Sequence, residues 1–182
     1  MTAATKLIFD HQHFDITIRR LSYQLIENHD DFAESVIIGI QPRGIFLSGR
    51  IHKLLTEMNV QPSLKHGQLD ISFFRDDFRR REMIVPSATN IDFVVENKKV
   101  ILVDDVLYTG RTIRAALDAL LAFGRPKKVE LLVLVNRKFS RDLPIEADYV
   151  GISIDSITTD KVNVKWKETE GEDGIWLTTE TE

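Results

Sequence analysis

The fold is decided by residues 100–112, which read Val100-Ile101-Leu102-Val103-Asp104-Asp105-Val106-Leu107-Tyr108-Thr109-Gly110-Arg111-Thr112. The β-branched and apolar run at 99–103 predicts a strand. Apolar residues at helical spacing over 112–123, closed by a glycine, predict a helix. Two carboxylates therefore stand between a strand and a short turn that leads into a helix.

This arrangement has a chemical consequence. Open α/β sheets bind ligands at the carboxyl ends of their strands, where Asp104 and Asp105 are expected. The turn with Thr109, Gly110 and Thr112 would point backbone N–H groups and hydroxyls at one spot, at the positive end of a helix dipole, which suits a phosphate. Phosphate on the turn and sugar hydroxyls on the carboxylates describe a ribose 5-phosphate. The competing interpretation, an ordinary strand end and glycine turn, explains each residue singly but not all thirteen together.

Strands and helices alternate on both sides of this segment. Helices are expected at about 15–28 and 44–57, and strands at 35–40, 69–74, 91–95 and 129–135. This alternation predicts an α/β fold with a central, mainly parallel sheet flanked by helices and joined by right-handed crossovers. Short β-like pieces at 148–154, 162–166 and 174–177 are expected to form a small cap, or hood, on that sheet.

Composition bounds the function. The chain has 182 residues, 43% of them hydrophobic and 29% charged, with a formal net charge of −4 and no cysteine. It is long enough for a real core, and it excludes disulfides, iron–sulfur clusters and cysteine nucleophiles. Its charge gives no sign of general nucleic-acid affinity. Apolar runs are too short to span a bilayer, so no membrane partner and a cytoplasmic location are expected.

Two other phosphate-binding classes share part of this pattern. A strand ending in two aspartates also fits P-loop NTPases, whose partner motif is G-x-x-x-x-G-K-[ST]. Residues 39–44 supply both glycines, but Ile45 and Phe46 stand where the lysine and hydroxyl belong, so that class is excluded. In phospho-acceptor domains the acidic residues come from separate strands, without a Thr-Gly-x-Thr turn directly after a pair.

Residues 100–112 resemble the 5-phosphoribosyl-1-pyrophosphate (PRPP) motif of type I phosphoribosyltransferases. The resemblance covers most of the chain and is greatest to the bacterial family of pyrimidine operon regulators that are also uracil phosphoribosyltransferases. Further matching segments are 39–45, 69–77, 124–126, 143–145 and 147–151. It implies the type I phosphoribosyltransferase fold over 1–182 as a single domain, with a core at about 14–136, a hood formed by about 137–182 plus N-terminal residues, and a flexible loop at about 75–90.

The resemblance also implies roles for individual residues. Asp104 and Asp105 would hold the ribose hydroxyls as catalytic residues, and Mg²⁺ would be bound through the ribose and PRPP beside them, with Asp155 as a further ligand. The 5-phosphate would be wrapped by Leu107, Tyr108, Thr109, Gly110, Arg111 and Thr112. Pyrophosphate would be bound by Gln41, Pro42, Arg43 and Gly44. In this fold class the pyrophosphate loop often holds a cis peptide, expected here between Pro42 and Arg43.

The charged run at 75–82 is a candidate lid. Water would hydrolyse the reactive sugar, so a cover is needed during transfer. Arg75 would then be a catalytic residue that reaches the pyrophosphate. The alternative is a solvated hairpin tip, and without the resemblance the two are equally good.

The identity of the base stays open at this point. Tyr108 stands where purine-specific relatives place an aspartate, which favours uracil. Segment 150–155, with Asp155, looks more like the hood of purine enzymes, and segment 136–142 also departs from the regulator's pattern. Base contacts are assigned to Arg137, Tyr149 and Val150.

The expected partners are PRPP and a free nucleobase, in a homodimer or larger oligomer. The first alternative is a nucleotide-sensing regulator that binds RNA and has little catalysis. Arg19 and Arg20 could contribute to an RNA surface, but Ile152 stands where the regulator has a lysine, and the chain is net acidic. RNA binding is therefore disfavoured, since each phosphate contact needs a cation. The second alternative is a hypoxanthine/guanine phosphoribosyltransferase.

Overall fold

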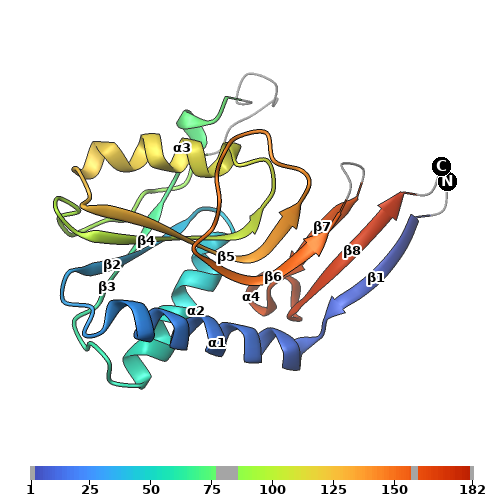
Figure 1. Cartoon of the computed structure of the whole chain (residues 1–182), viewed down its shortest axis with the longest axis horizontal. Coiled ribbons are helices and arrows are strands. Elements are labelled where there is room, and N and C mark those ends of the chain that lie inside the picture. The colour runs from blue at the N-terminus through green and yellow to red at the C-terminus, as the bar shows by residue number, and fades with distance from the viewer. Residues whose placement is uncertain (1–2, 77–85, 157–159, 181–182) are drawn as a thin grey trace.

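The computed structural model describes residues 3–76, 86–156 and 160–180. Its strands form two sheets (Figure 1). The larger sheet contains, in spatial order, β3 (Lys65–Leu69), β2 (Ser35–Ile40), β4 (Lys99–Leu107), β5 (Lys128–Lys138) and β6 (Tyr149–Asp155). The smaller sheet contains β1 (Ala3–Phe9), β8 (Gly174–Glu180) and β7 (Lys161–Lys165). The helices are α1 (His11–His29), α2 (Gly44–Glu57), α3 (Arg111–Leu120) and the short α4 (Lys167–Glu170).

All four pairings in the larger sheet are parallel. Helices cover both of its faces, with α3 on one side and α1 and α2 on the other (Figure 1). The expected α/β class is therefore confirmed. Because parallel strands all end at one edge, the segments that follow β2, β4 and β5 meet there.

The central strand β4 serves both layers of the core. Ile101 and Val103 pack with α1 and α2, whereas Val100 and Leu102 pack with α3. All four side chains are at most 1% exposed. A strand buried on both faces explains why this segment is a continuous apolar run without polar alternation.

The strand expected over 69–74 lies earlier in the chain. Strand β3 ends at Leu69, and Ser72–Phe74 form a 3-10 turn. The side chain of Asp70 accepts hydrogen bonds from the backbone N–H of Ser72, at 3.0 Å, and from its hydroxyl, at 2.6 Å. Such a local aspartate turn competes with strand pairing, so the chain turns away at the residue after Leu69.

The strand expected over 91–95 is also absent. Within the described stretch 86–98, pairing with β3 is limited to an isolated bridge between Asn90 and Gln68. Ile91, Phe93 and Val95 nevertheless point toward the α3 side of the core. The alternation of apolar and polar residues over 91–95 correctly predicted which side chains are buried. These side chains reach the core without the chain forming a paired strand.

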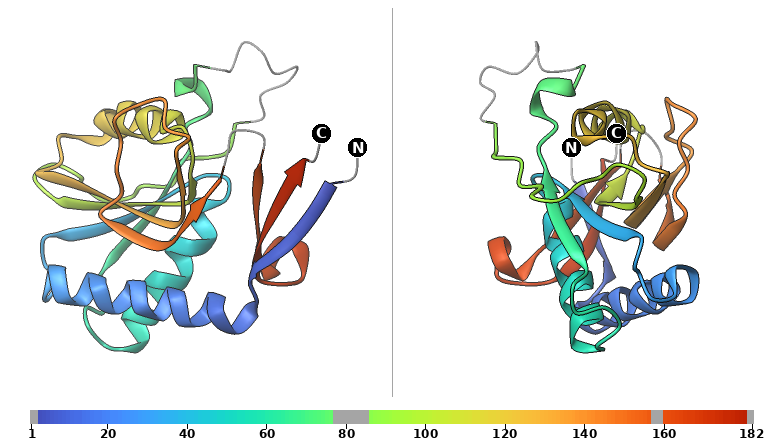
Figure 2. Two further views of the ribbon diagram at one scale, coloured as in Figure 1. Left: turned by 45° about the vertical axis from the view of Figure 1, so that its right-hand side comes forward. Right: turned by 90° about the vertical axis from the view of Figure 1, so that its left-hand side faces the viewer.

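The C-terminal pieces belong to two different sheets. Strand β6 pairs in parallel with β5 and is the fifth strand of the main sheet, contrary to the expectation that 148–154 is part of a cap. Strands β7 and β8 pair with each other and, through β8, with β1. Figure 2 shows this smaller sheet standing beside the carboxyl ends of the main strands.

The helix boundaries agree closely with expectation, with two differences. Helix α1 begins at His11 rather than near residue 15, because the side chain of Asp10 accepts the backbone N–H of His13 and caps the helix. Helix α3 ends at Leu120, and the expected last turn is the 3-10 turn Leu121–Phe123. In the ranges that the structure describes, no helix has the length and apolar character needed to cross a membrane.

Helix α2 begins against the central strand, and only a glycine fits at this point. A Cβ on Gly44 would lie 2.4 Å from the carbonyl oxygen of Val103 and 3.0 Å from the Cα of Asp104. Gly49, in the same helix, has nothing within 4 Å of the corresponding position. The contact at Gly44 holds the loop after β2 directly against the residues that carry the acid pair.

These two glycines make a matched test. We expect Gly44→Ala to lower the free energy of unfolding by about 2 kcal/mol, because the backbone of β4 must shift. Gly49→Ala should raise it by about 1 kcal/mol, since alanine favours helix more than glycine does. Urea unfolding measures both, and equal effects of the two substitutions would contradict the close approach.

Candidate functional site

Two buried carboxylates lie near the carboxyl end of β4. Asp104 and Asp105 are 6% and 9% exposed, and the backbone N–H of Asp105 donates to the side chain of Asp104 at 2.9 Å. Strand β4 continues to Leu107, beyond its expected end at 103, so the pair lies within the strand rather than after it.

Burial is the main cause of the unusual electrostatics of this pair. It raises the pKa of Asp104 well above the ordinary value, and repulsion from Asp105 raises it further. Burial also raises the pKa of Asp105, although the charge of Arg43 and its hydrogen bond oppose that shift. A site that holds two carboxylates this close favours ligands that bring hydrogen-bond donors or positive charge.

The turn after β4 forms a small cavity. Gly110 adopts φ 91°, in the left-handed region, and precedes the first residue of α3. A cavity of about 230 Å³ is lined by Arg75 and by Val106, Leu107, Tyr108, Thr109, Gly110, Arg111, Thr112 and Ile113. The residues predicted to wrap a phosphate are therefore brought together at the N-terminus of a ten-residue helix.

Neighbouring segments hold this turn. The carbonyl of Thr109 accepts the backbone N–H groups of Asp142 and Leu143. The side chain of Arg111 is engaged by two carboxylates, Asp76 at 2.7 Å and Asp142 at 3.1 Å. Because its guanidinium is committed in this way, the contribution of Arg111 to a phosphate site comes from the helix start rather than from its side chain.

Arg75 belongs to the same cavity. It lines the wall beside the turn and favours the ionised form of Asp104, lowering its pKa against the effect of burial. The rest of the proposed lid, residues 77–85, lies outside the described residues. The structure thus places the first arginine of the charged run beside both the acid and the turn.

The loop after β2 lies at the same edge of the sheet. Its cis peptide joins Gln41 and Pro42, so the expected cis bond between Pro42 and Arg43 is wrong. An amide nitrogen that belongs to proline is where the cis form is most accessible. The backbone N–H of Gln41 donates to the carbonyl of Leu69, and its side chain donates to that of Ala88.

Arg43 makes three contacts that connect this loop to the rest of the site. Its Nε donates to Asp105 at 3.1 Å, and its Nη1 donates to Glu170 at 2.9 Å. Its Nη2 donates to the carbonyl of Val164, at the end of β7. Arg43 thus joins the acid pair to the smaller sheet.

Glu170 was not identified from the sequence. Hydrogen bonds from the hydroxyl of Thr169 and the backbone N–H of Trp166, together with Arg43, lower its pKa to about 2. It is therefore a permanent anion beside the predicted pyrophosphate loop. A run of charges near a chain end usually indicates solvated surface. Because 127 residues separate Glu170 from Arg43, no local sequence pattern could predict their contact.

The residues predicted to contact the base are not brought together. Tyr149 is at the start of β6, opposite Leu132, and its hydroxyl donates to Glu130 at 2.9 Å. Val150 follows it in the strand and lies opposite Val133. Arg137 is opposite Ile154, toward the carboxyl end of β6. In the strand register Tyr149 is level with Val103 of β4, but its hydroxyl is engaged by Glu130. Contact of Tyr149 with a base stays a prediction.

Asp155, predicted to help hold magnesium, ends β6. Its side chain is 72% exposed and faces Lys138 at 3.4 Å. Within the described ranges, no group of three or more histidine, aspartate or glutamate side chains is arranged to hold a metal ion. Asp155 therefore does not form a three-acid metal site with Asp104 and Asp105.

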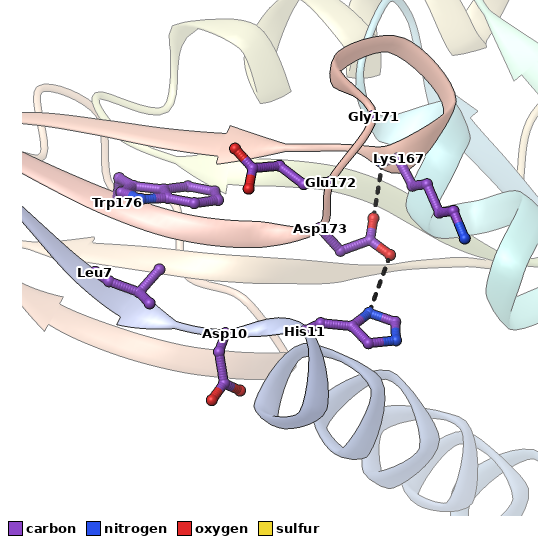
Figure 3. A pocket seen from close by; sticks show the side chains of 8 residues that line it. All are labelled: Leu7, Asp10, His11, Lys167, Gly171, Glu172, Asp173 and Trp176. Carbon is purple, nitrogen blue, oxygen red and sulfur yellow. Dashed lines mark hydrogen bonds and ion pairs between the residues drawn. The ribbon is translucent and has the colours of Figure 1, made fainter.

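A second cavity of about 340 Å³ is lined by none of the predicted site residues (Figure 3). It lies between the start of α1 and the smaller sheet, and His11 and the backbone N–H of Lys167 contact Asp173 there. Asp173 also pairs with Arg50 at 2.7 Å. The buried acid in this cavity is thus satisfied by the chain itself.

Comparison with known proteins agrees with this geometry. A family model described as a phosphoribosyl transferase domain matches residues 4–169. The chain is 44% identical to the bifunctional protein PyrR of Desulfosudis oleivorans over 173 residues, 94% of this chain and 95% of that protein. It is 43% identical to the protein of the same name from Elusimicrobium minutum, over 94% and 96% of the two chains.

Solved structures show the same fold at lower identity. A hypoxanthine phosphoribosyltransferase of Trypanosoma cruzi superposes with a TM-score of 0.71 at 16% identity, over 97% of each chain. The corresponding enzyme of Staphylococcus aureus gives 0.68 at 19% identity, over 96% of this chain and 92% of that one. At these identities the likeness concerns the fold alone.

The raised pKa of Asp104 predicts that this residue costs stability. Because the native state disfavours the ionised form, the free energy of unfolding falls as pH rises from the ordinary carboxyl range, about pH 4, through the raised pKa. We expect Asp104→Asn to raise the melting temperature at pH 7.5 and to lose this advantage near pH 4. Exposed Asp118, which pairs with Arg114 on α3, is the control, and its Asn variant should differ from wild type by no more than about 0.5 kcal/mol. A melting temperature lowered by Asp104→Asn at pH 7.5 would contradict the prediction.

Proposed function

Because the chain belongs to the phosphoribosyltransferase family, we propose that it transfers the phosphoribosyl group of PRPP to uracil, giving UMP and pyrophosphate. Transfer of a phosphoribosyl group follows from the family. The choice of uracil, the use of Mg²⁺ and the roles of individual residues are parts of the proposal.

One observation carries the proposal. The acid pair, the glycine turn at a helix N-terminus and Arg75 surround the same carboxyl edge, and the turn and Arg75 share one cavity. A ribose 5-phosphate needs hydrogen-bond acceptors for its hydroxyls and backbone N–H groups for its phosphate, a short distance apart. Both are available at this edge.

The acid pair suits the reaction. As the bond from C1 of the ribose to pyrophosphate breaks and the bond to a ring nitrogen of the base forms, positive charge develops on the sugar ring. The carboxylates of Asp104 and Asp105 accept the ribose hydroxyls and stabilise that charge at fixed positions. Arg43 joins the proposed pyrophosphate loop to Asp105. Because Asp105 and Glu170 already engage its guanidinium, its part in the proposal is to orient the loop and the acid pair.

Magnesium fits the residues present. Mg²⁺ prefers oxygen ligands and is usually bound by one or two carboxylates together with substrate phosphates. The mutual repulsion that raises the pKa of Asp104 is relieved by a nearby cation. When bound with PRPP, the ion neutralises charge on the leaving pyrophosphate. The residues that would orient it are Asp104 and Asp105, through the sugar hydroxyls.

Uracil is supported by two points. The aromatic Tyr108 occupies the position where purine-specific relatives carry an aspartate, and the chain resembles the pyrimidine regulator family over most of its length. Asp155, the residue that suggested a purine hood, is exposed and paired with Lys138. A purine transferase is therefore the second choice.

An RNA-binding regulator with little catalysis is less well supported. Arg20 donates to the carbonyl groups of Val150 and Gly151 and so belongs to the packing of α1 on β6. Arg19 lies 3.5 Å from Asp15. These contacts reduce the positive charge that helix α1 can offer to RNA phosphates. The expectations of a homo-oligomer and a cytoplasmic location stay predictions.

A radiolabelled-base assay tests the proposal. With PRPP and Mg²⁺, we expect the wild-type protein to convert uracil to UMP and to make little IMP or GMP. The variant Asp104→Asn with Asp105→Asn should lose at least about 100-fold in turnover, as expected when transition-state charge stabilisation is removed.

Each other outcome of this assay has a clear meaning. IMP or GMP as the main product would replace uracil with a purine, whereas no product together with tight RNA binding would favour the regulator. Near-normal turnover by the double variant would remove the ribose role of the acid pair.

Arg75 provides a separate test. We expect Arg75→Ala to lower turnover about 10- to 100-fold by removing a positive charge near the leaving group, while UMP affinity changes less than about twofold. Arg19→Ala, at an exposed position on α1, is the control. Calorimetry with UMP would contradict this role if affinity fell as much as turnover, because Arg75 would then serve the 5-phosphate.

A further inference from the structure

Arg137 is a buried arginine. It lies near the end of β5 and is 6% exposed. A guanidinium is always charged, so burial at this depth requires partners. Its Nε donates to the hydroxyl of Ser156 at 2.9 Å, and its Nη2 donates to the carbonyl of Asp160 at 2.9 Å. Both partners belong to the segment between β6 and β7.

The plane of Arg137 also covers an aromatic ring. Its central guanidinium carbon lies 3.9 Å from the centroid of the Tyr108 ring. A guanidinium stacked on an aromatic face is attracted by the electrons of the ring, more strongly where water is excluded. Tyr108 is the first residue after β4 and belongs to the phosphate turn.

The backbone of Tyr108 is held as well. Arg141 donates through Nη1 to the carbonyl of Tyr108 and through Nη2 to the side chain of Asn136 at 2.6 Å. Two arginines thus hold the first residue of the turn: Arg137 stacks on the ring of Tyr108, and Arg141 donates to its carbonyl. Both arginines come from the end of β5 and the segment after it.

We propose that Arg137 is a positioning residue for PRPP, which acts by fixing the ring of Tyr108 and not by contacting the base. Its two hydrogen bonds orient the guanidinium, the stacked ring fixes the direction in which the turn leaves β4, and the N–H groups of 109–112 then converge on the 5-phosphate. The inference deepens the proposed function and depends on it only in that the turn binds this phosphate.

The arrangement also connects two parts of the molecule. Asp160 directly precedes β7, and Val164 in that strand supplies its carbonyl to Arg43. The segment after β6 therefore supports the phosphate turn through Arg137 and the pyrophosphate loop through Arg43.

The test separates sugar-phosphate binding from base binding. Calorimetry gives the dissociation constant of ribose 5-phosphate, and steady-state kinetics give KM for PRPP and for the base. We expect Arg137→Gln and Tyr108→Leu each to weaken ribose 5-phosphate binding and to raise KM for PRPP about tenfold. For Arg137→Gln, KM for the base should change less than about twofold. Tyr108→Phe, which keeps the ring, should retain most of the affinity that Tyr108→Leu loses.

Coupling and a matched control complete the experiment. If Arg137 acts through the ring, combining Arg137→Gln with Tyr108→Leu should weaken ribose 5-phosphate binding no more than the stronger single variant. The control is Lys138→Gln, next along β5, where the side chain is half-exposed and pairs with Asp155; it should behave as wild type.

Three results would overturn the inference. A rise in KM for the base alone would assign Arg137 to base contact. A lowered melting temperature with unchanged ribose 5-phosphate affinity would make it purely structural, and the two tyrosine variants make the same distinction if Arg137→Gln does not fold. Failure of the wild-type protein to bind ribose 5-phosphate would remove the site itself, whereas binding without uracil turnover would count against the proposed base only.

Discussion

The burial of two adjacent carboxylates is the constraint around which this site is arranged. Asp104 and Asp105 occupy consecutive positions of the buried central strand, where burial opposes the ionisation of both and repulsion from Asp105 adds to this effect for Asp104. Arg43 offsets part of this cost for Asp105, and Arg75 does so for Asp104. A ligand with hydroxyl donors or a cation offsets more, so binding energy is available where the sugar is proposed to lie.

The geometry that supports this pair is a consequence of the parallel sheet. Because β2, β4 and β5 run in the same direction, the cis-proline loop, the phosphate turn and Arg137 all lie where these strands end, at one edge. The close approach of Gly44 to Val103 removes the space between two of these segments. Val164 of the smaller sheet and Glu170 of α4 then complete the arrangement, since both accept hydrogen bonds from Arg43.

Some expectations failed because local pattern does not determine pairing. The alternation at 69–74 is that of a strand, but the side chain of Asp70 ends the strand by bonding to Ser72. The alternation at 91–95 correctly predicted which side chains are buried, but this segment does not form a paired strand. Strand β6 was expected in a cap, yet it pairs with β5 as the fifth strand of the main sheet.

The order of residues was enough to predict the alternating α/β core, the acid pair, the glycine turn and the family to which the chain belongs. These features are local: a run of apolar residues, two charges and a glycine within thirteen positions are enough to specify a strand, a site and a turn. Only the tertiary structure decided which distant residues complete the site. Strand register puts Tyr149 level with Val103 and Arg137 further toward the carboxyl edge, although both lie in apolar strands. Arg43 meets Glu170 and Arg137 meets Tyr108 only after the sheet has formed, and such long-range contacts leave no mark in the local order of residues.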